Sequence, residues 1–214
     1  MTDAPAGCIC IVDDDAEIRS SLGSLFRSAG FAVALYDSPR EFLAAGIPAV
    51  ASCLVLDVRL RGESGLDFQE QLAAQGMAIP VVMMTGHGDI PMTVRAMRAG
   101  AIDFLPKPFS DEEMLAAVAR AIESDRAQRL ADAEGTRLRD RFAHLTPRER
   151  EVMGLVVGGL MNKQVAGRLN LSEITVKIHR GNVMRKMEAQ SLADLVRMAE
   201  QLGVRDETAH RYNI

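Results

Sequence analysis

Short apolar runs alternate with longer amphipathic segments through the first 123 residues. The apolar runs lie at residues 8–12, 32–36, 52–56, 79–84 and 101–105. Runs of this length are typical of strands that are buried on both faces of a parallel sheet. Helix-length amphipathic segments accompany them at residues 15–29, 38–45, 64–75, 89–99 and 110–123. This repeated alternation predicts a doubly wound α/β domain, residues 1–123, built on a five-stranded parallel sheet.

The pattern changes after residue 123. Residues 124–145 are rich in Ala, Arg, Asp and Glu, which predicts a charged helical extension or linker. The pattern leaves open whether this segment continues the preceding helix. A new unit begins at Thr146, where a hydroxyl cap, Pro147 and Glu149 have the spacing of a capping box.

Four short helices are expected in this second unit. The predicted helices run from residue 147 to about Val157, from an Asn162 cap to Arg168, from Glu173 behind a Ser172 cap to about Met187, and over residues 191–202. A tight turn around Asn170 separates the second helix from the third, an arrangement typical of a helix-turn-helix. We therefore expect a small all-α domain of four helices at residues 146–204, followed by a polar tail at 205–214.

Charge is distributed unevenly between the two parts. Residues 1–123 carry 9 Lys and Arg against 17 Asp and Glu, whereas residues 124–214 carry 16 against 12. An acidic half joined to a basic half favours a control domain fused to a polyanion binder. No apolar run reaches the roughly 18 residues of a membrane span, and the N-terminus lacks a basic signal region. The expectation is a cytoplasmic protein with no membrane partner.

The cysteines are Cys8, Cys10 and Cys53, all in predicted strands. An odd count without metal-ligand spacing argues against a disulfide framework or a zinc site. Small buried core residues are the plain interpretation. Redox sensing stays open as an alternative, because Cys10 and Cys53 would lie on neighbouring strands.

Polar residues of complementary kinds follow the predicted strands. They are Asp13, Asp14, Asp57, Thr85 and Lys107. Ligands of doubly wound sheets bind outside the carboxyl ends of the strands, so these side chains are expected to converge on one rim. Clustered carboxylates favour Mg²⁺, and a carboxylate can attack phosphorus to form an aspartyl phosphate. The ammonium and the hydroxyl can stabilise phosphoryl oxygens. The alternative is a solvated acidic rim, in which aspartates such as Asp15 cap helices.

The first 123 residues resemble the receiver domains of two-component response regulators. The resemblance rests on four motifs, Ile11–Asp15, Leu54–Asp57, Met84–Gly86 and Phe104–Phe109, and the stretch from Met84 to Phe109 is especially similar to the FixJ branch. It implies a flavodoxin-like fold in which Asp57 accepts a phosphoryl group from a sensor histidine kinase, with Lys107 and Thr85 beside it.

The same resemblance implies a metal site and a switch. Mg²⁺ would be bound by Asp14, Asp57 and the backbone carbonyl of Arg59, with Asp13 contributing mainly through water. Thr85 and Phe104 would form the switch pair that repacks the surface of residues 89–105, through which the phosphorylated protein would dimerise. An ordinary core role for Phe104 stays open. The peptide bond from Lys107 to Pro108 is expected to be cis.

Residues 145–200 resemble the LuxR-type helix-turn-helix of the NarL/FixJ regulators. The matching motifs are Leu145–Val152, Asn162–Ala166, Leu171–His179 and Asn182–Met187. In the third helix, Val176, Val183 and Met187 recur on one apolar stripe, which leaves other faces for DNA. The alternative is a helical domain that binds protein through a solvated basic face.

Candidate DNA-binding residues lie on the second and third helices of this module. They are Lys163, Gln164, Thr175, Lys177, Ile178, His179, Arg180, Gly181 and Arg185. Cations suit phosphates and base edges, and an apolar Ile178 would suit a thymine methyl. Gly181 leaves room for close approach, although it weakens the helix by about 1 kcal/mol.

Together the patterns and the resemblances predict a transcription regulator. Phosphorylation of Asp57 would control sequence-specific DNA binding, and the FixJ branch favours activation. The implied partners are a histidine kinase, promoter DNA, a second copy of the chain and RNA polymerase. An enzyme acting through an aspartyl phosphate would need a second carboxylate two residues after Asp57, where this chain has Arg59, so we expect no enzyme. Whether the receiver covers the DNA-binding module or promotes its pairing stays open.

Overall fold

Five parallel strands form the sheet of the first of two units, residues 1–130 and 131–214. The computed structural model describes residues 7–86 and 88–204, so the predicted tail at 205–214 lies outside the described residues. The strand order is β2-β1-β3-β6-β7, and every neighbouring pair is parallel. The strands are β1 (Cys8–Val12), β2 (Ala32–Tyr36), β3 (Ser52–Asp57), β6 (Val81–Thr85) and β7 (Ala101–Pro106). The predicted five-stranded parallel sheet is confirmed.

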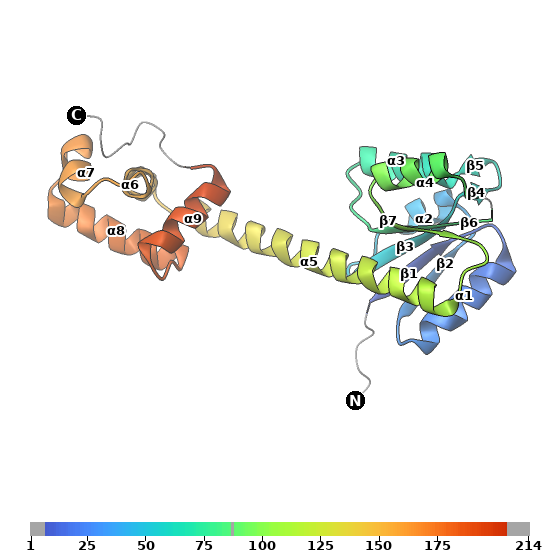
Figure 1. Ribbon diagram of the computed structural model, residues 1–214. Helices are drawn as coiled ribbons and strands as arrows, with labels where there is room; N and C mark the ends of the chain where they lie inside the picture. The colour runs from blue at the N-terminus through green and yellow to red at the C-terminus, as the bar shows by residue number, and fades with distance from the viewer. Residues whose placement is uncertain (1–6, 87, 205–214) are drawn as a thin grey trace. The chain divides into compact units, whose positions relative to one another are not determined.

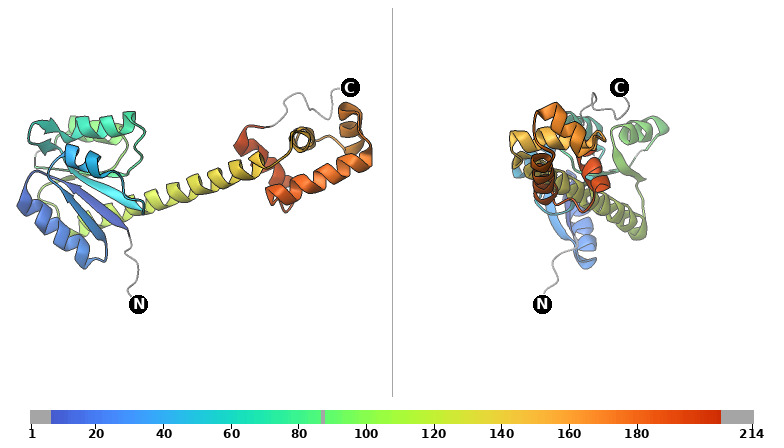
Figure 2. Two further views of the ribbon diagram at one scale, coloured as in Figure 1. Left: turned by 180° about the vertical axis from the view of Figure 1, so that it is seen from behind. Right: turned by 90° about the vertical axis from the view of Figure 1, so that its left-hand side faces the viewer.

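Helices cover both faces of this sheet, as Figure 1 shows and Figure 2 repeats from behind. They are α1 (Ala16–Ser28), α2 (Pro39–Ala45), α3 (Gly65–Ala74), α4 (Ile90–Arg98) and α5 (Asp111–Ala143). Phe42, Leu72 and Ala96 bring α2, α3 and α4 into one buried cluster. Phe26 and Met114 bring α1 and α5 into a second cluster on the opposite face. Because both faces are covered, the strands consist almost entirely of apolar residues.

Helix α5 settles the open question about residues 124–145. It is one helix of 33 residues, from Asp111 to Ala143, so the charged segment continues the preceding helix. The carboxylate of Asp125 accepts hydrogen bonds from the Ser52 backbone N–H, at 2.8 Å, and from the Arg129 side chain, at 2.6 Å. Arg129 in turn donates to the carbonyl of Pro48 at 3.0 Å. These contacts hold α5 against the start of β3 beyond residue 123.

A small hairpin between β3 and α3 was not predicted. Strands β4 (Arg59–Leu60) and β5 (Glu63–Ser64) pair antiparallel, and Gly62 takes a left-handed φ of 82° at the turn. Two-residue strands are too short to leave an alternating pattern. The hairpin matters because it begins two residues after Asp57.

The second unit contains the four predicted helices. They are α6 (Pro147–Val157), α7 (Asn162–Leu169), α8 (Glu173–Met187) and α9 (Leu192–Leu202). The Thr146 capping box and the Ser172 cap are confirmed. The expected Asn162 cap is wrong: Met161 is the cap residue of α7 and Asn162 is its first helical residue. The Oδ1 of Asn162 instead accepts a hydrogen bond from Arg180 at 3.2 Å, so this side chain ties α7 to α8.

The turn between α7 and α8 depends on a left-handed residue. Asn170 has φ 53° and ψ 52°, a conformation that asparagine adopts more readily than most residues. The predicted apolar stripe of α8 is confirmed, because Val176, Val183 and Met187 are buried. No helix in the described ranges is long and apolar enough to cross a bilayer.

Candidate functional site

The carboxyl ends of β1 and β3 bring two carboxylates onto one ammonium. Asp13 directly follows β1 and Asp57 ends β3, and both are buried. Lys107 follows β7, and its Nζ lies 2.7 Å from Asp57 Oδ1 and 3.2 Å from Asp13 Oδ2. The other carboxylate oxygen of Asp57 accepts the backbone N–H of Arg59 at 2.7 Å. Strand order therefore assembles residues that lie up to 94 positions apart in sequence.

Electrostatics keep Lys107 charged in this position. Partial burial alone would lower its pKa, but the hydrogen bond to Asp57 and the charges of Asp57 and Asp13 outweigh burial and raise the pKa. Burial is the main cause that raises the pKa of Asp13, against the hydrogen bond from the Asp15 backbone and the charge of Lys107. Two carboxylates share one ammonium, so the site favours further positive charge.

Asp14 occupies a different position from its neighbour. Its carboxylate forms an ion pair at 3.0 Å with the exposed side chain of Arg61, from the β4–β5 hairpin. Among the described residues no group of three or more His, Cys, Asp or Glu forms a ready metal cluster. The donors at this rim are hard carboxylate oxygens, few in number, which suits Mg²⁺ because that ion keeps several waters and phosphate oxygens of its own.

Thr85 and Phe104 meet beside Gly88. Thr85 ends β6 and is fully buried, and its carbonyl accepts the Lys107 backbone N–H at 2.6 Å. A Cβ placed on Gly88 would lie 3.1 Å from the Phe104 ring and 3.3 Å from the Thr85 methyl group. The two side chains therefore border the same small space. The peptide bond from Lys107 to Pro108 is cis, as the resemblance implied.

Gly65 is a residue of this site that sequence reasoning missed. It opens α3, and its N–H donates to the carbonyl of Val58 at 2.9 Å. A Cβ at this position would lie 2.0 Å from the backbone oxygen of Asp57. No larger residue fits without displacing β3 or α3. The one available signal was a glycine at the start of a predicted helix, eight residues after Asp57.

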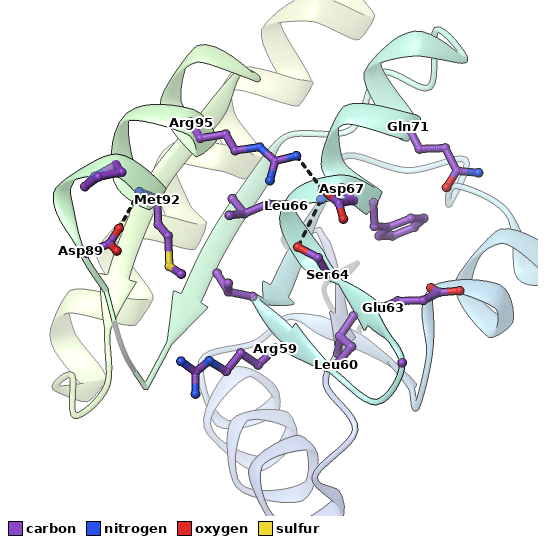
Figure 3. Close-up of a pocket in the computed structure, with 14 residues that line it drawn as sticks. Arg59, Leu60, Glu63, Ser64, Leu66, Asp67, Gln71, Asp89, Met92 and Arg95 are labelled. Carbon is purple, nitrogen blue, oxygen red and sulfur yellow. Dashed lines mark hydrogen bonds and ion pairs between the residues drawn. The ribbon is translucent and has the colours of Figure 1, made fainter.

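Helices α3 and α4 are joined by charged side chains beside an open pocket (Figure 3). Arg95 of α4 contacts Asp67 at 2.6 Å and Glu70 at 2.7 Å, both on α3. The β4–β5 hairpin, α3 and the start of α4 line the pocket, which lies next to the acidic rim rather than on it. Outside the pocket wall, α4 exposes several large apolar side chains: Ile90, Val94 and Met97.

The candidate DNA-binding residues divide by exposure. Lys163, Gln164, Lys177, Ile178, Gly181 and Arg185 are exposed, whereas Thr175, His179 and Arg180 are half-buried. Nothing lies within 4 Å of a Cβ built on Gly181, so the space predicted beside it is present. Arg180 bonds Asn162, as described above, and Gln164 Oε1 accepts the Met161 N–H at 2.8 Å. These two side chains therefore also stabilise α7.

The cysteines do not form the pair that the redox alternative suggested. All three are free thiols. Cys10 packs into the cluster under α2, α3 and α4, whereas Cys53 packs into the cluster under α1 and α5. They lie on neighbouring strands but on opposite faces of the sheet. Burial raises the pKa of the Cys53 thiol, which disfavours its reactive thiolate.

Two family models match the chain. Residues 9–119 match "Response regulator receiver domain", and residues 143–199 match "Bacterial regulatory proteins, luxR family". The first match contains the whole acidic rim with Lys107, and the second contains α6, α7 and α8.

Relatives match over nearly the whole chain. Nodulation protein W of Bradyrhizobium diazoefficiens is 57% identical over 196 residues, which cover 92% of this chain and 86% of that protein. Transcriptional regulatory protein FixJ of the same organism is 42% identical over 199 residues, covering 92% and 97%. The solved structure of the response regulator StyR is 47% identical, with a TM-score of 0.83, and covers 91% of this chain and 98% of that chain.

Proposed function

The chain belongs to the NarL/FixJ family of two-component response regulators, and we propose that Asp57 is the phosphoacceptor through which a histidine kinase controls its binding to promoter DNA. The observation that carries the proposal is the setting of the Asp57 carboxylate. One oxygen contacts Lys107 and the other accepts the Arg59 N–H, each at 2.7 Å. The ammonium and the backbone N–H orient a buried carboxylate at the open end of the sheet, where a phosphoryl group can reach it.

The phosphoryl transfer follows from this geometry. An Asp57 oxygen attacks the phosphorus of a phosphohistidine, the new O–P bond forms, and the P–N bond to the imidazole breaks. Lys107 offsets the negative charge that develops on the phosphoryl oxygens, and the Thr85 hydroxyl bonds one of them in the product. Lys107 therefore gives up its ion pair with Asp57 for one with the phosphate.

Mg²⁺ is the proposed cofactor, held by Asp14, Asp57 and the backbone carbonyl of Arg59, with Asp13 acting mainly through water. It would supply positive charge between the carboxylates and the phosphoryl group. Asp14 reaches this role by leaving Arg61, and that pair is weak because the arginine side chain is exposed. The chain's own residues provide the oxygen donors that this ion prefers.

We further propose that the Thr85–Phe104 pair carries the signal to α4. Movement of Thr85 toward the phosphoryl group frees space beside Gly88, into which the Phe104 ring can turn. The surface formed by α4 and β7 then changes shape. Because α4 exposes Ile90, Val94 and Met97, this surface suits pairing with a second copy of the chain. Allosteric couplings of this kind are about 1–3 kcal/mol, which shifts populations without a new fold.

The second unit is the proposed DNA reader. Its contacts are Lys163, Gln164, Thr175, Lys177, Ile178, His179, Arg180, Gly181 and Arg185. Two copies on a two-fold site would place two α8 helices in successive major grooves. We propose domain limits of 1–123 for the receiver, 124–145 for the linker and 146–204 for the DNA-binding domain. The protein would act in the cytoplasm, where it meets kinase, promoter and RNA polymerase, as an activator of transcription rather than as an enzyme.

The test is DNA selection by the full chain, with and without a small phosphodonor and Mg²⁺. We expect the donor to tighten binding to the selected sequence and Asp57→Ala to abolish that gain. Asp37→Ala is the matched control, because this exposed aspartate follows the edge strand β2. Binding that is tight and indifferent to donor and variant would remove Asp57 as the switch. Failure to select any sequence would refute the DNA-binding proposal itself.

A further inference from the structure

Two isoleucines lie on the exposed face of α8, in the first two turns of the helix. Ile174 is 74% exposed and Ile178 is 59% exposed. They lie four residues apart and therefore on the same face of the helix, opposite the buried stripe of Val176, Val183 and Met187. Ile178 was a candidate in the sequence, but Ile174 was not. The structure adds that the Ile174 side chain is at least as exposed as that of Ile178.

The charged residues of α8 indicate what kind of molecule this face binds. Helix α8 has four Lys and Arg residues and a single acidic residue, Glu173. One cation, Lys186, is used inside the unit, because it pairs at 2.7 Å with the buried Glu149. Lys177, next to Ile178 in sequence, and Arg185, in the last turn of the helix, are both exposed. A cationic helix with exposed apolar side chains in its first two turns fits a polyanion whose groove offers apolar groups between its charged walls, and the major groove of DNA is such a surface.

Within the major groove, one base edge carries an exposed methyl group. That base is thymine, whose C5 methyl is the apolar group that side chains such as Ala and Phe contact. We propose that Ile174 and Ile178 each contact a thymine methyl, so that this pair favours thymine at two positions of every half-site. The inference rests on the proposed DNA-binding function and deepens it, since it names the bases that are recognised.

Helix geometry sets the distance between the two thymines. Four residues of α-helix advance about 6 Å, and successive base pairs are about 3.4 Å apart. The two methyl groups therefore lie within about two base steps of each other. Gly181, one turn beyond Ile178, has nothing within 4 Å of its Cβ position. This gap lets the helix sit deep enough for isoleucine side chains to touch the base edges.

The test removes the methyl group and nothing else. The phosphodonor-treated full chain first selects its sequence from a random DNA pool, and each thymine of the half-site is then replaced in turn by deoxyuridine. We expect two positions at which this change weakens binding about fourfold, the value for one buried methyl-sized group. Ile174→Ala should abolish the effect at one position and Ile178→Ala at the other. Leu192→Ala is the control, an exposed apolar residue of the same unit on α9.

Each outcome has one meaning. Selected half-sites without two nearby thymines, or equal deoxyuridine penalties in the parent and both alanine variants, would overturn the inference while leaving DNA binding intact. A loss of transcription in the alanine variants with unchanged base preference would assign this face to a protein partner and also overturn it. If no sequence is selected at all, the proposed function fails first. The deoxyuridine series on the parent protein needs no variant to fold.

Discussion

Replacing Gly65 with alanine should damage the proposed phosphoacceptor site without touching a charged residue. The added methyl carbon would start 2.0 Å from the backbone oxygen of Asp57, whereas ordinary contacts begin at 3.4 Å. The start of α3 and the end of β3 must therefore separate by about 1 Å or more. Overpacking of this kind costs about 1–3 kcal/mol, which lowers the melting temperature of a domain of this size by roughly 4–12 °C.

The functional cost should exceed the loss of stability. Asp57 is held by contacts of 2.7 Å to Lys107 and to the Arg59 N–H, and a displaced strand end lengthens both. A misplacement of about 1 Å in a reacting group can cost about 10²-fold in rate. The assay is the initial rate of phosphorylation by a small phosphodonor with Mg²⁺, followed by mass spectrometry at a temperature where the variant is folded.

Gly23→Ala is the matched control. The three heavy atoms nearest to its added methyl would all belong to the flexible end of Arg27 in α1, the first of them at 3.0 Å. Alanine there should keep the parent rate and gain slightly in helix stability. A Gly65→Ala protein that melts and reacts like the parent would refute the argument from close approach.

Three further outcomes are expected. Glu149→Gln removes a buried carboxylate that pairs with Lys186 at 2.7 Å, at a cost of about 1–3 kcal/mol to the second unit. Although burial opposes it, the hydrogen bond from Lys186 helps to lower the Glu149 pKa below the ordinary 4.5. The stabilisation by this ion pair is therefore complete above pH 4.5 and is lost as the pH falls through the lowered pKa. The difference in melting temperature between the parent and Glu149→Gln should therefore be smaller at pH 3 than at pH 7. Asp125→Ala leaves the Ser52 N–H without its acceptor at 2.8 Å. Amide hydrogen exchange should rise at Ser52 and in the turns of α5 that follow residue 125. Unchanged exchange would show that this contact does not hold the helix. Val94→Asp places a charge on the exposed face of α4 and should prevent phosphodonor-induced pairing in light scattering, whereas a dimer of unchanged affinity would exclude that face.

Local patterns predicted most elements because each has a local cause. Three helices are capped by the side-chain oxygens of Asp15, Thr146 and Ser172. Each oxygen accepts a hydrogen bond from a backbone N–H no more than three residues further along, so such caps can be recognised in the sequence. The α7 cap failed because Asn162, a good capping residue, lies one position inside the helix and bonds Arg180 instead. A tertiary contact thus overrode a local preference.

The sequence predicted which residues lie at the candidate site, but it did not predict which of them contact one another. Asp13, Asp57, Thr85 and Lys107 all follow apolar runs, so parallel topology alone brings them to one rim. The ion pair of Asp14 with Arg61 and the close approach of Gly65 involve residues in or directly after the β4–β5 hairpin. That hairpin is too short to leave a pattern.

Apolar periodicity, capping and strand ends are local properties, and they were sufficient to predict the two units, most of their helices and strands, and the residue types at the rim. Three features were established only by the folded chain: α5 continues as a helix to Ala143, Cys10 and Cys53 face opposite sides of the sheet, and the side chain of Ile174 is 74% exposed. The second and third of these depend on which surfaces the elements bury against one another. Burial depends on contacts between residues that are distant in sequence, so the local sequence predicts it only in part.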